Sequence, residues 1–204
     1  MISDIIRNTL IESWPMLTIF IVTLACVRIL YIVDNNEKLV FFEEFMNLMF
    51  IIYVLILYRL LTYTEGASAG VNLIPFKEIL RHKFNSTLFY YNVIGNIALF
   101  VPFGYFVSRH TRAKKAGHLL IATAIVSFTI EATQYEIGRA FDVDDILLNV
   151  IGALCGFLLY IALTAIKNHL PKFLQKNAIY NILSIILIVI MILYLSKIFG
   201  LGWF

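Results

Sequence analysis

The chain has 204 residues, of which 61% are hydrophobic and only 14% are charged, and its mean hydropathy is +0.87. A soluble domain is typically about 45–50% apolar and about 25% charged, so this composition excludes an ordinary soluble domain and predicts an integral membrane protein. The formal net charge of +3 is too small an excess to favour nucleic acid as a partner.

Six apolar stretches approach the roughly 20 residues that a helix needs to cross a bilayer. They are Pro15–Val33, Met46–Tyr63, Leu88–Val107, Leu119–Thr133, Ile146–Ile166 and Ile179–Ile198. This pattern predicts an all-α fold, a polytopic transmembrane helical bundle of about six helices. We expect two helices in an N-terminal region, 1–63, three in a core, 64–170, and one in a C-terminal region, 171–204.

The positions of Lys and Arg indicate the orientation, because short cytoplasmic loops carry an excess of both. The two short loops 109–116 and 167–178 together carry seven basic residues: Arg109, Arg112, Lys114, Lys115, Lys167, Lys172 and Lys176. We therefore place these loops in the cytoplasm, and the segments 64–87 and 137–145 then face outward.

Polar side chains are costly in a bilayer, so their positions indicate where a site could lie. They collect in four segments, Asn72–Phe76, Asn92–Gly104, Ser127–Gln134 and Arg139–Gly152. Helical spacing places three groups each on one helix face: Asn92 with Asn96, Ser127 with Glu131 and Gln134, and Asp142 with Asp145 and Asn149. Asp144 falls off the last face and is expected to meet water. Since a short turn joins the last two segments, we expect their polar faces to meet near the outer membrane boundary.

Purely structural interpretations also fit these residues. Asp142 and Asp145 match the N-cap of a helix and its N3 partner. Gly152 and Gly156 form a small-xxx-small face for close helix packing. Glu131 and Arg139 could form an ion pair between two helices.

The functional interpretation is an outward polar pocket. In it Glu131 or Asp145 would handle protons or a cation, and Arg139 would hold an anionic group such as a phosphate. Aspartate and asparagine oxygens can bind Mg²⁺, but no spacing here identifies a metal site, and the sequence indicates no cofactor.

The four polar segments also carry a family resemblance. NLIPF, N-x-x-G-N-x-x-x-F-x-P-F-G, S-x-x-x-E-x-x-Q and R-x-F-D-x-x-D-x-x-x-N-x-x-G follow one another within residues 72–156. This order resembles the VanZ family of small bacterial membrane proteins. The resemblance implies a multi-pass helical bundle in the cytoplasmic membrane of a Gram-positive bacterium. The founding member is linked to reduced sensitivity to teicoplanin, a lipoglycopeptide antibiotic that targets cell-wall precursors at the outer surface. The recurring polar positions of the family fall here on Asn96, Pro102, Glu131, Gln134, Arg139, Asp142, Asp145 and Asn149.

Three hypotheses follow. In the first, the chain is a non-transporting envelope protein, with membrane lipids as partners, that lowers sensitivity to teicoplanin-type antibiotics by binding an anionic envelope lipid or cell-wall precursor. Its ligand-binding residues would be Asn96, Gln134, Arg139, Asp142 and Asn149. In the second, the chain is an intramembrane enzyme that modifies a polyprenyl-phosphate or lipid head group, with Glu131 and Asp145 as catalytic groups, although no nucleophile motif is recognisable. The third, a small transporter or channel, has the least support because no internal repeat is visible.

Overall fold

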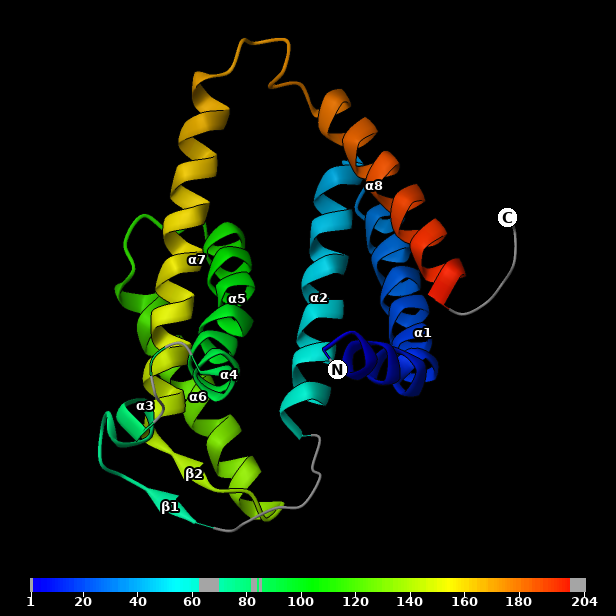
Figure 1. Ribbon diagram of the computed structural model, residues 1–204. Helices are drawn as coiled ribbons and strands as arrows, with labels where there is room; N and C mark the ends of the chain where they lie inside the picture. Colours follow the sequence, from blue (N-terminus) through cyan, green and yellow to red (C-terminus); the bar gives the residue numbers. More distant parts are fainter. Residues whose placement is uncertain (1, 63–69, 82–83, 85, 199–204) are drawn as a thin grey trace. The chain divides into compact units, whose positions relative to one another are not determined.

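Long apolar helices dominate the described part of the chain, as expected for a membrane protein, because a bilayer offers no hydrogen-bond partners and a helix pairs its own backbone groups. The computed structural model describes residues 2–62, 70–81, 84 and 86–198 (Figure 1). The chain divides into two compact units. The first joins Met1–Arg59 with Lys167–Phe204, and the second is Leu60–Ile166.

The first unit contains three long helices: α1 (Ile2–Asp34), most of α2 (Phe41–Thr62) and α8 (Asn177–Ile198). The guanidinium of Arg28 on α1 donates to both carboxylate oxygens of Glu44 on α2, at 3.0 and 2.9 Å. The backbone N–H of Phe42 donates to the Asn181 Oδ1 of α8 at 2.9 Å. Polar contacts at their ends therefore join all three helices.

The second unit is a bundle preceded by two short helical segments. Its elements are α4 (Thr87–Phe89), the π-helical segment η1 (Tyr90–Ile94), α5 (Gly95–Thr111), α6 (Gly117–Glu136) and most of α7 (Val143–His169). α5, α6 and α7 lie side by side in Figure 1. α6 buries a stripe spaced by four and three residues: Leu119, Thr123, Ser127, Glu131 and Gln134. This confirms that the fold is an all-α helical bundle.

Glycines bring α5 and α7 into backbone contact. A Cβ on Gly104 of α5 would overlap the backbone of Ala153, and a Cβ on Gly152 or Gly156 of α7 would overlap the backbone of α5. Only a residue without a side chain fits at these places, and the small-xxx-small face of α7 lies in the helix interface.

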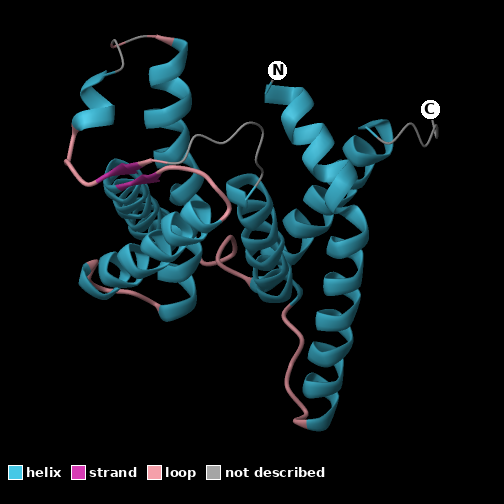
Figure 2. Ribbon diagram, turned by 90° about the horizontal axis from the view of Figure 1, so that it is seen from below, coloured by secondary structure: helices cyan, strands magenta, loops and turns pink. Residues whose placement is uncertain are grey.

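A two-stranded parallel sheet and a short helix lie at one end of the second unit. β1 (Val71–Asn72) pairs with β2 (Phe141–Asp142), and α3 (Lys77–Arg81) follows β1. Figure 2 shows the two strands running side by side, and Figure 1 places them with α3 near the start of α7. The strands therefore fix the segment before α4 to the turn between α6 and α7.

Four helices of the described chain are long and apolar enough to cross a membrane. These candidate spans are Trp14–Asp34, Phe41–Leu61, Thr87–Thr111 and Val143–His169, and Asn177–Leu193 is a shorter apolar helix. α6 covers the fourth predicted stretch but does not join them, because polar residues recur at every turn of its buried face. The helix predicted over 146–166 begins earlier, at Val143.

Candidate functional site

The register of the small sheet brings Asn72 opposite Asp142. The Asn72 side chain donates to the Asp142 Oδ1 at 2.8 Å, and its own Oδ1 accepts from the Ile74 N–H at 3.3 Å. Asn72 is 8% exposed. This asparagine therefore joins the NLIPF segment to the start of α7 and shapes the turn that follows β1.

Asp144 holds the same segment from a second side. Its carboxylate accepts three backbone N–H groups, from Phe76 at 2.5 Å, from Glu78 at 2.8 Å and from Ile79 at 3.2 Å. Asp144 is 1% exposed. The prediction that Asp144 meets water was wrong, because the start of α3 supplies backbone donors that a helical wheel of α7 does not include.

The first turn of α7 is capped in two ways. Asp142 precedes the helix, and its Oδ1 accepts the Asp144 N–H at 2.8 Å, as an N-cap side chain does. The Asp142 N–H donates to the Glu131 Oε2 at 3.0 Å. Glu131, which is 2% exposed, thus occupies the place that an N3 carboxylate has in a capping box. Asp145 has a different partner.

That partner is Asn96 of α5, whose side-chain amide donates to the Asp145 Oδ1 at 2.5 Å. The bond joins α5 to α7. The π-helical turn of η1 lies directly before α5 and contains Asn92. Such turns are frequent at functional sites because they re-aim the side chains on either side.

Asn149 lies one turn further along α7 than Asp145. Its amide donates to the Ser127 Oγ of α6 at 2.9 Å, and both residues are buried. Asn149 and Glu131 therefore both lie in the α6–α7 interface. Their contacts hold the two helices together.

Gln134 and Arg139 meet at the end of α2. The Gln134 Nε2 and the Arg139 guanidinium each donate to the Leu61 carbonyl at 2.9 Å. This carbonyl is in the last turn of α2, where backbone oxygens lack helical partners and cations are favoured. No ion pair joins Arg139 to Glu131 among the described residues, so the predicted pairing is replaced by a shared helix cap.

A Schellman turn sets the place of Arg139. Gly138 has φ 85°, its N–H donates to the Tyr135 carbonyl at 3.0 Å, and the Arg139 N–H donates to the Gln134 carbonyl at 2.9 Å. Glycine is needed at this left-handed position, where a Cβ is disfavoured. The turn ends α6 and directs the chain back toward β2.

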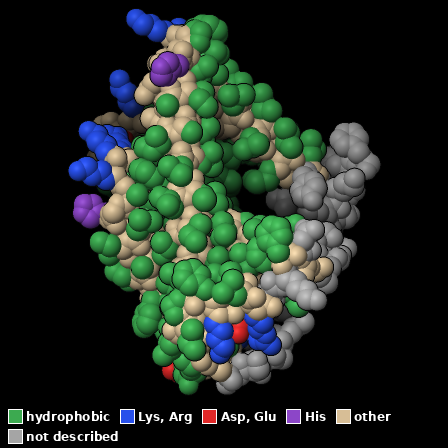
Figure 3. Space-filling model, turned by 60° about the vertical axis from the view of Figure 1, so that its left-hand side comes forward, with side chains coloured by type: hydrophobic (Ala, Val, Ile, Leu, Met, Phe, Trp, Pro, Cys, Tyr) green, Lys and Arg blue, Asp and Glu red, His purple; other side chains and the backbone are tan. Residues whose placement is uncertain are grey.

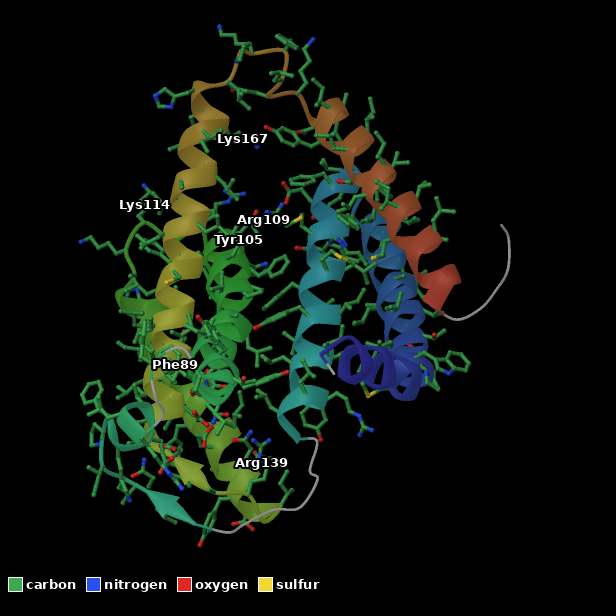
Figure 4. The ribbon with its side chains drawn as sticks, viewed as in Figure 1. Phe89, Tyr105, Arg109, Lys114, Arg139 and Lys167 are labelled. Carbon is green, nitrogen blue, oxygen red and sulfur yellow. The ribbon has the colours of Figure 1, made fainter. Side chains whose placement is uncertain are left out.

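These contacts surround a cavity of about 150 Å³ at this end of the second unit. Its lining residues are Glu78, Ile79, Asn92, Val93, Asn96, Arg139, Asp142, Asp144, Asp145 and Leu148. Four predicted site residues are among them: Asn96, Arg139, Asp142 and Asp145. Glu131, Gln134 and Asn149 are not in the lining. Their hydrogen bonds join the elements that surround the cavity. Arg139 lies at this end of the molecule in Figure 4.

Glu78 and Asp144 line the cavity but were not predicted as site residues. Glu78 lies between the second and third predicted stretches, and its signal is its place two residues after the NLIPF motif. The signal for Asp144 is that acidic residues crowd the start of one helix, with Asp142 directly before it and Asp144 and Asp145 in its first turn, more than a cap requires.

Carboxylates outnumber cations around the cavity. Glu78, Asp142, Asp144 and Asp145 face one lining cation, Arg139. Burial raises the pKa of the Asp142 carboxyl above its ordinary 3.8, while its bonds from the Asp144 N–H and the Asn72 amide act in the opposite direction. The donor set suits a small polar group whose negative part pairs with the guanidinium and whose hydroxyl groups donate to carboxylates. Among the described residues, no three His, Cys, Asp or Glu side chains are placed to hold a metal ion.

Comparison with known proteins supports the motif assignment. The VanZ/LLP1 family model matches residues 45–167, which is more than half of the chain and contains every residue that lines the cavity. Comparisons with curated proteins and with solved structures found no match.

Proposed function

The chain belongs to the VanZ/LLP1 family, and from this membership we propose that it lowers sensitivity to lipoglycopeptide antibiotics of the teicoplanin type. In this proposal the cavity binds the polar head group of an anionic envelope lipid or cell-wall precursor. The observation that carries it is the cavity itself, where Asn96, Arg139, Asp142 and Asp145 from three parts of the chain line one space.

Arg139 would hold the anionic part of the ligand. One guanidinium nitrogen donates to the Leu61 carbonyl, which fixes the side chain at the cavity wall. A guanidinium has five N–H donors in a planar arrangement that matches two oxygens of a phosphate or carboxylate. Asn96 and Asp145 would then bind the neutral, hydroxyl-bearing part of the same head group.

The distribution of basic residues supports an outward-facing cavity. Figure 4 shows Arg109 and Lys114 well above Arg139, which lies near the lower end of the second unit. The short loop 109–116 carries four basic residues, and the longer segment 64–87 at the cavity end carries three. Because the positive-inside rule gives most weight to short loops, the loop with Arg109 and Lys114 faces the cytoplasm. The cavity then opens at the outer membrane face, where lipid-linked precursors and the antibiotic meet.

Antibiotic susceptibility with matched variants tests the proposal. The wild-type chain, Arg139→Gln, Asp145→Asn and the control Lys114→Gln are expressed in a sensitive host, and their amounts in the membrane are equalised by immunoblot. We expect the wild-type chain and Lys114→Gln to raise the inhibitory concentration of teicoplanin, and Arg139→Gln to abolish the increase. If Arg139→Gln protects as well as wild type at equal membrane level, the cavity has no part in the effect.

The second candidate function is an intramembrane enzyme that modifies a polyprenyl-phosphate or lipid head group. The observation that favours it is the place of Asp145, a carboxylate in the cavity lining that is held by Asn96 and could exchange a proton with a ligand. Mass spectrometry of envelope lipids incubated with the purified protein separates the candidates. A changed head-group mass that Asp145→Asn prevents supports the enzyme, and unchanged lipids support binding alone.

A further inference from the structure

The segment that closes the cavity, residues 71–81, has an unusual surface. We call this segment the cap. Its turn and α3 expose large apolar side chains, and the same surface continues to Phe84. Leu80 is 80% exposed and Phe84 is 86% exposed, although both belong to a connection between helices. Such a surface is costly in water and indicates a lipid or protein partner.

The three faces of α3 differ in character. Leu80 forms the apolar outer face of α3, and the exposed Phe76 directly precedes the helix. Lys77 and Arg81 form a basic face beside it. Glu78 and Ile79 line the cavity. One turn of helix therefore separates the cavity from an exposed apolar and basic surface.

The cap is connected to the first turns of two candidate membrane spans, once through the chain and once through hydrogen bonds. Phe84 lies three residues before the candidate span Thr87–Thr111, so the cap cannot be far from the membrane boundary. Asp144 in the first turn of the candidate span Val143–His169 bonds the backbone of Phe76, Glu78 and Ile79. Covalent linkage and hydrogen bonding thus place the exposed apolar side chains next to the bilayer.

The charges of the cap fit an anionic lipid surface. Arg81 forms an ion pair with Glu78 at 3.2 Å, and 72% of the Arg81 side chain is exposed. Lys77 is also exposed, so that α3 carries a net positive charge. Figure 3 shows basic and acidic side chains set among hydrophobic ones at the lower end of the molecule. Basic side chains beside buried apolar ones are the pattern by which short amphipathic segments bind anionic membranes.

We propose that the cap is a membrane-docking element, with Phe76 and Leu80 inserted among the lipids of the adjacent leaflet and Lys77 and Arg81 at anionic head groups. The partner is the bilayer that the chain itself spans. The mouth of the cavity then lies at head-group depth. The conclusion that the ligand of the cavity comes from this leaflet rests on the proposed function, whereas the docking does not.

Tryptophan fluorescence tests the docking. Trp14 and Trp203, the two tryptophans of the chain, are replaced by Phe, and a single tryptophan is introduced by Leu80→Trp or, as the control, by Lys114→Trp in the exposed loop at the opposite end. The full-length protein is placed in nanodiscs, one chain each, with and without brominated phosphatidylcholine.

We expect Leu80→Trp to emit at shorter wavelength than Lys114→Trp, to be quenched by brominated acyl chains, and to resist aqueous iodide several-fold better. Two outcomes overturn the proposal. One is iodide quenching of Leu80→Trp equal to that of Lys114→Trp. The other is blue-shifted emission without bromine quenching, which would mean that protein covers the surface.

A second experiment tests whether the basic residues Lys77 and Arg81 attract anionic lipid. Brominated phosphatidylglycerol and brominated phosphatidylcholine are compared at the same low mole fraction. A basic residue at an anionic surface attracts lipid by an energy that corresponds to a few-fold local enrichment, so we expect the anionic lipid to quench Leu80→Trp roughly two- to fivefold more effectively. Adding Lys77→Gln and Arg81→Gln should remove this excess. Equal quenching by both lipids would overturn the basic face as a head-group site.

The failure of docking and the failure of the proposed function give different results. If every cavity variant keeps teicoplanin protection and Leu80→Trp is still quenched by lipid, the proposed function fails and the docking stands. Protection that depends on Arg139, with Leu80→Trp exposed to iodide, would do the reverse.

Discussion

Asp144→Asn tests how the cap is held over the cavity. The wild-type carboxylate uses one oxygen for the Phe76 N–H and the other for the N–H groups of Glu78 and Ile79. Asparagine has nearly the same shape but only one accepting oxygen. If that oxygen keeps Glu78 and Ile79, the amide NH₂ faces the Phe76 N–H, and two donors meet where a bond had been.

The expected loss follows from these three bonds. A hydrogen bond to a charged group contributes about 1.5–3 kcal/mol and a neutral one about 0.5–1.5 kcal/mol. Losing one charged bond and weakening two others to neutral strength predicts a loss of about 4 kcal/mol in the free energy that holds the cap. The burial of Asp144 limits how far water can replace the lost partner.

Hydrogen exchange of the purified protein in nanodiscs measures this loss locally. Since each 1.4 kcal/mol is a factor of about ten, amides of Phe76, Glu78 and Ile79 should lose roughly 1,000-fold in protection, while amides in the middle of α7 change little. The control is Asp34→Asn, at an exposed position outside the second unit. Protection of the cap amides within about threefold of wild type would refute the reasoning.

Three further substitutions probe the bundle. Gly152→Val should destabilise the protein by about 3 kcal/mol or more, because its Cβ meets the backbone of α5, whereas Gly117→Ala, which has open space around it, should leave the thermal unfolding midpoint in detergent nearly unchanged. Asn149→Ala should cost about 1–2 kcal/mol, and a double-mutant cycle with Ser127→Ala should show that most of this loss is shared; additive losses would contradict the bond. The raised pKa of Asp142 favours the protonated carboxyl in the folded state, so its contribution to stability is full below pH 3.8 and is lost as pH rises through the raised pKa. Asp142→Asn keeps the accepting Oδ1 and should lack this pH-dependent component in unfolding measurements across the acidic range, and an identical profile in wild type and variant would contradict it.

The helices were largely predictable because hydropathy acts on every residue of a membrane-crossing segment. The start of α7 was not, since Asp142, Asp144 and Asp145 lower the hydropathy of its first turn. Acidic residues are nevertheless favourable at a helix N-terminus, where they complement the dipole and cap free N–H groups. A search for apolar stretches therefore begins the helix at Ile146, and the cap chemistry begins it at Val143.

Spacing within a helix predicted which residues share a face, and the short turn between α6 and α7 predicted that their polar faces meet. Asn96 meets Asp145, and Asn149 meets α6. Spacing could not predict partners that are backbone groups. The Leu61 carbonyl attracts Arg139 because it ends a helix, and nothing in the identity of Leu61 signals this.

The same limit explains why the burial of Asp144 was not predicted. Its partners are three N–H groups of a segment more than sixty residues away, and they exist only once the chain turns after β1. A helical wheel treats a residue off the common face as solvated, because it does not include a separate segment, here residues 76–79, that packs against the end of the helix. The small sheet could not be predicted from the sequence either, because each strand is two residues long and carries no alternating pattern.

The structure separates the predicted site residues by what they contact, and this decides which substitutions test function. Glu131, Gln134 and Asn149 are buried and bond other parts of the fold. Removing any of them leaves buried donors or acceptors without partners, so a loss of activity there would follow from a loosened bundle as readily as from a lost ligand contact. Arg139 and Asp145 also bond the fold, through the Leu61 carbonyl and Asn96, but they line the cavity, so conservative changes at these two can alter binding directly. A role in binding is therefore best tested at the Arg139 guanidinium and at Asp145, with Glu131, Gln134 and Asn149 serving as tests of folding.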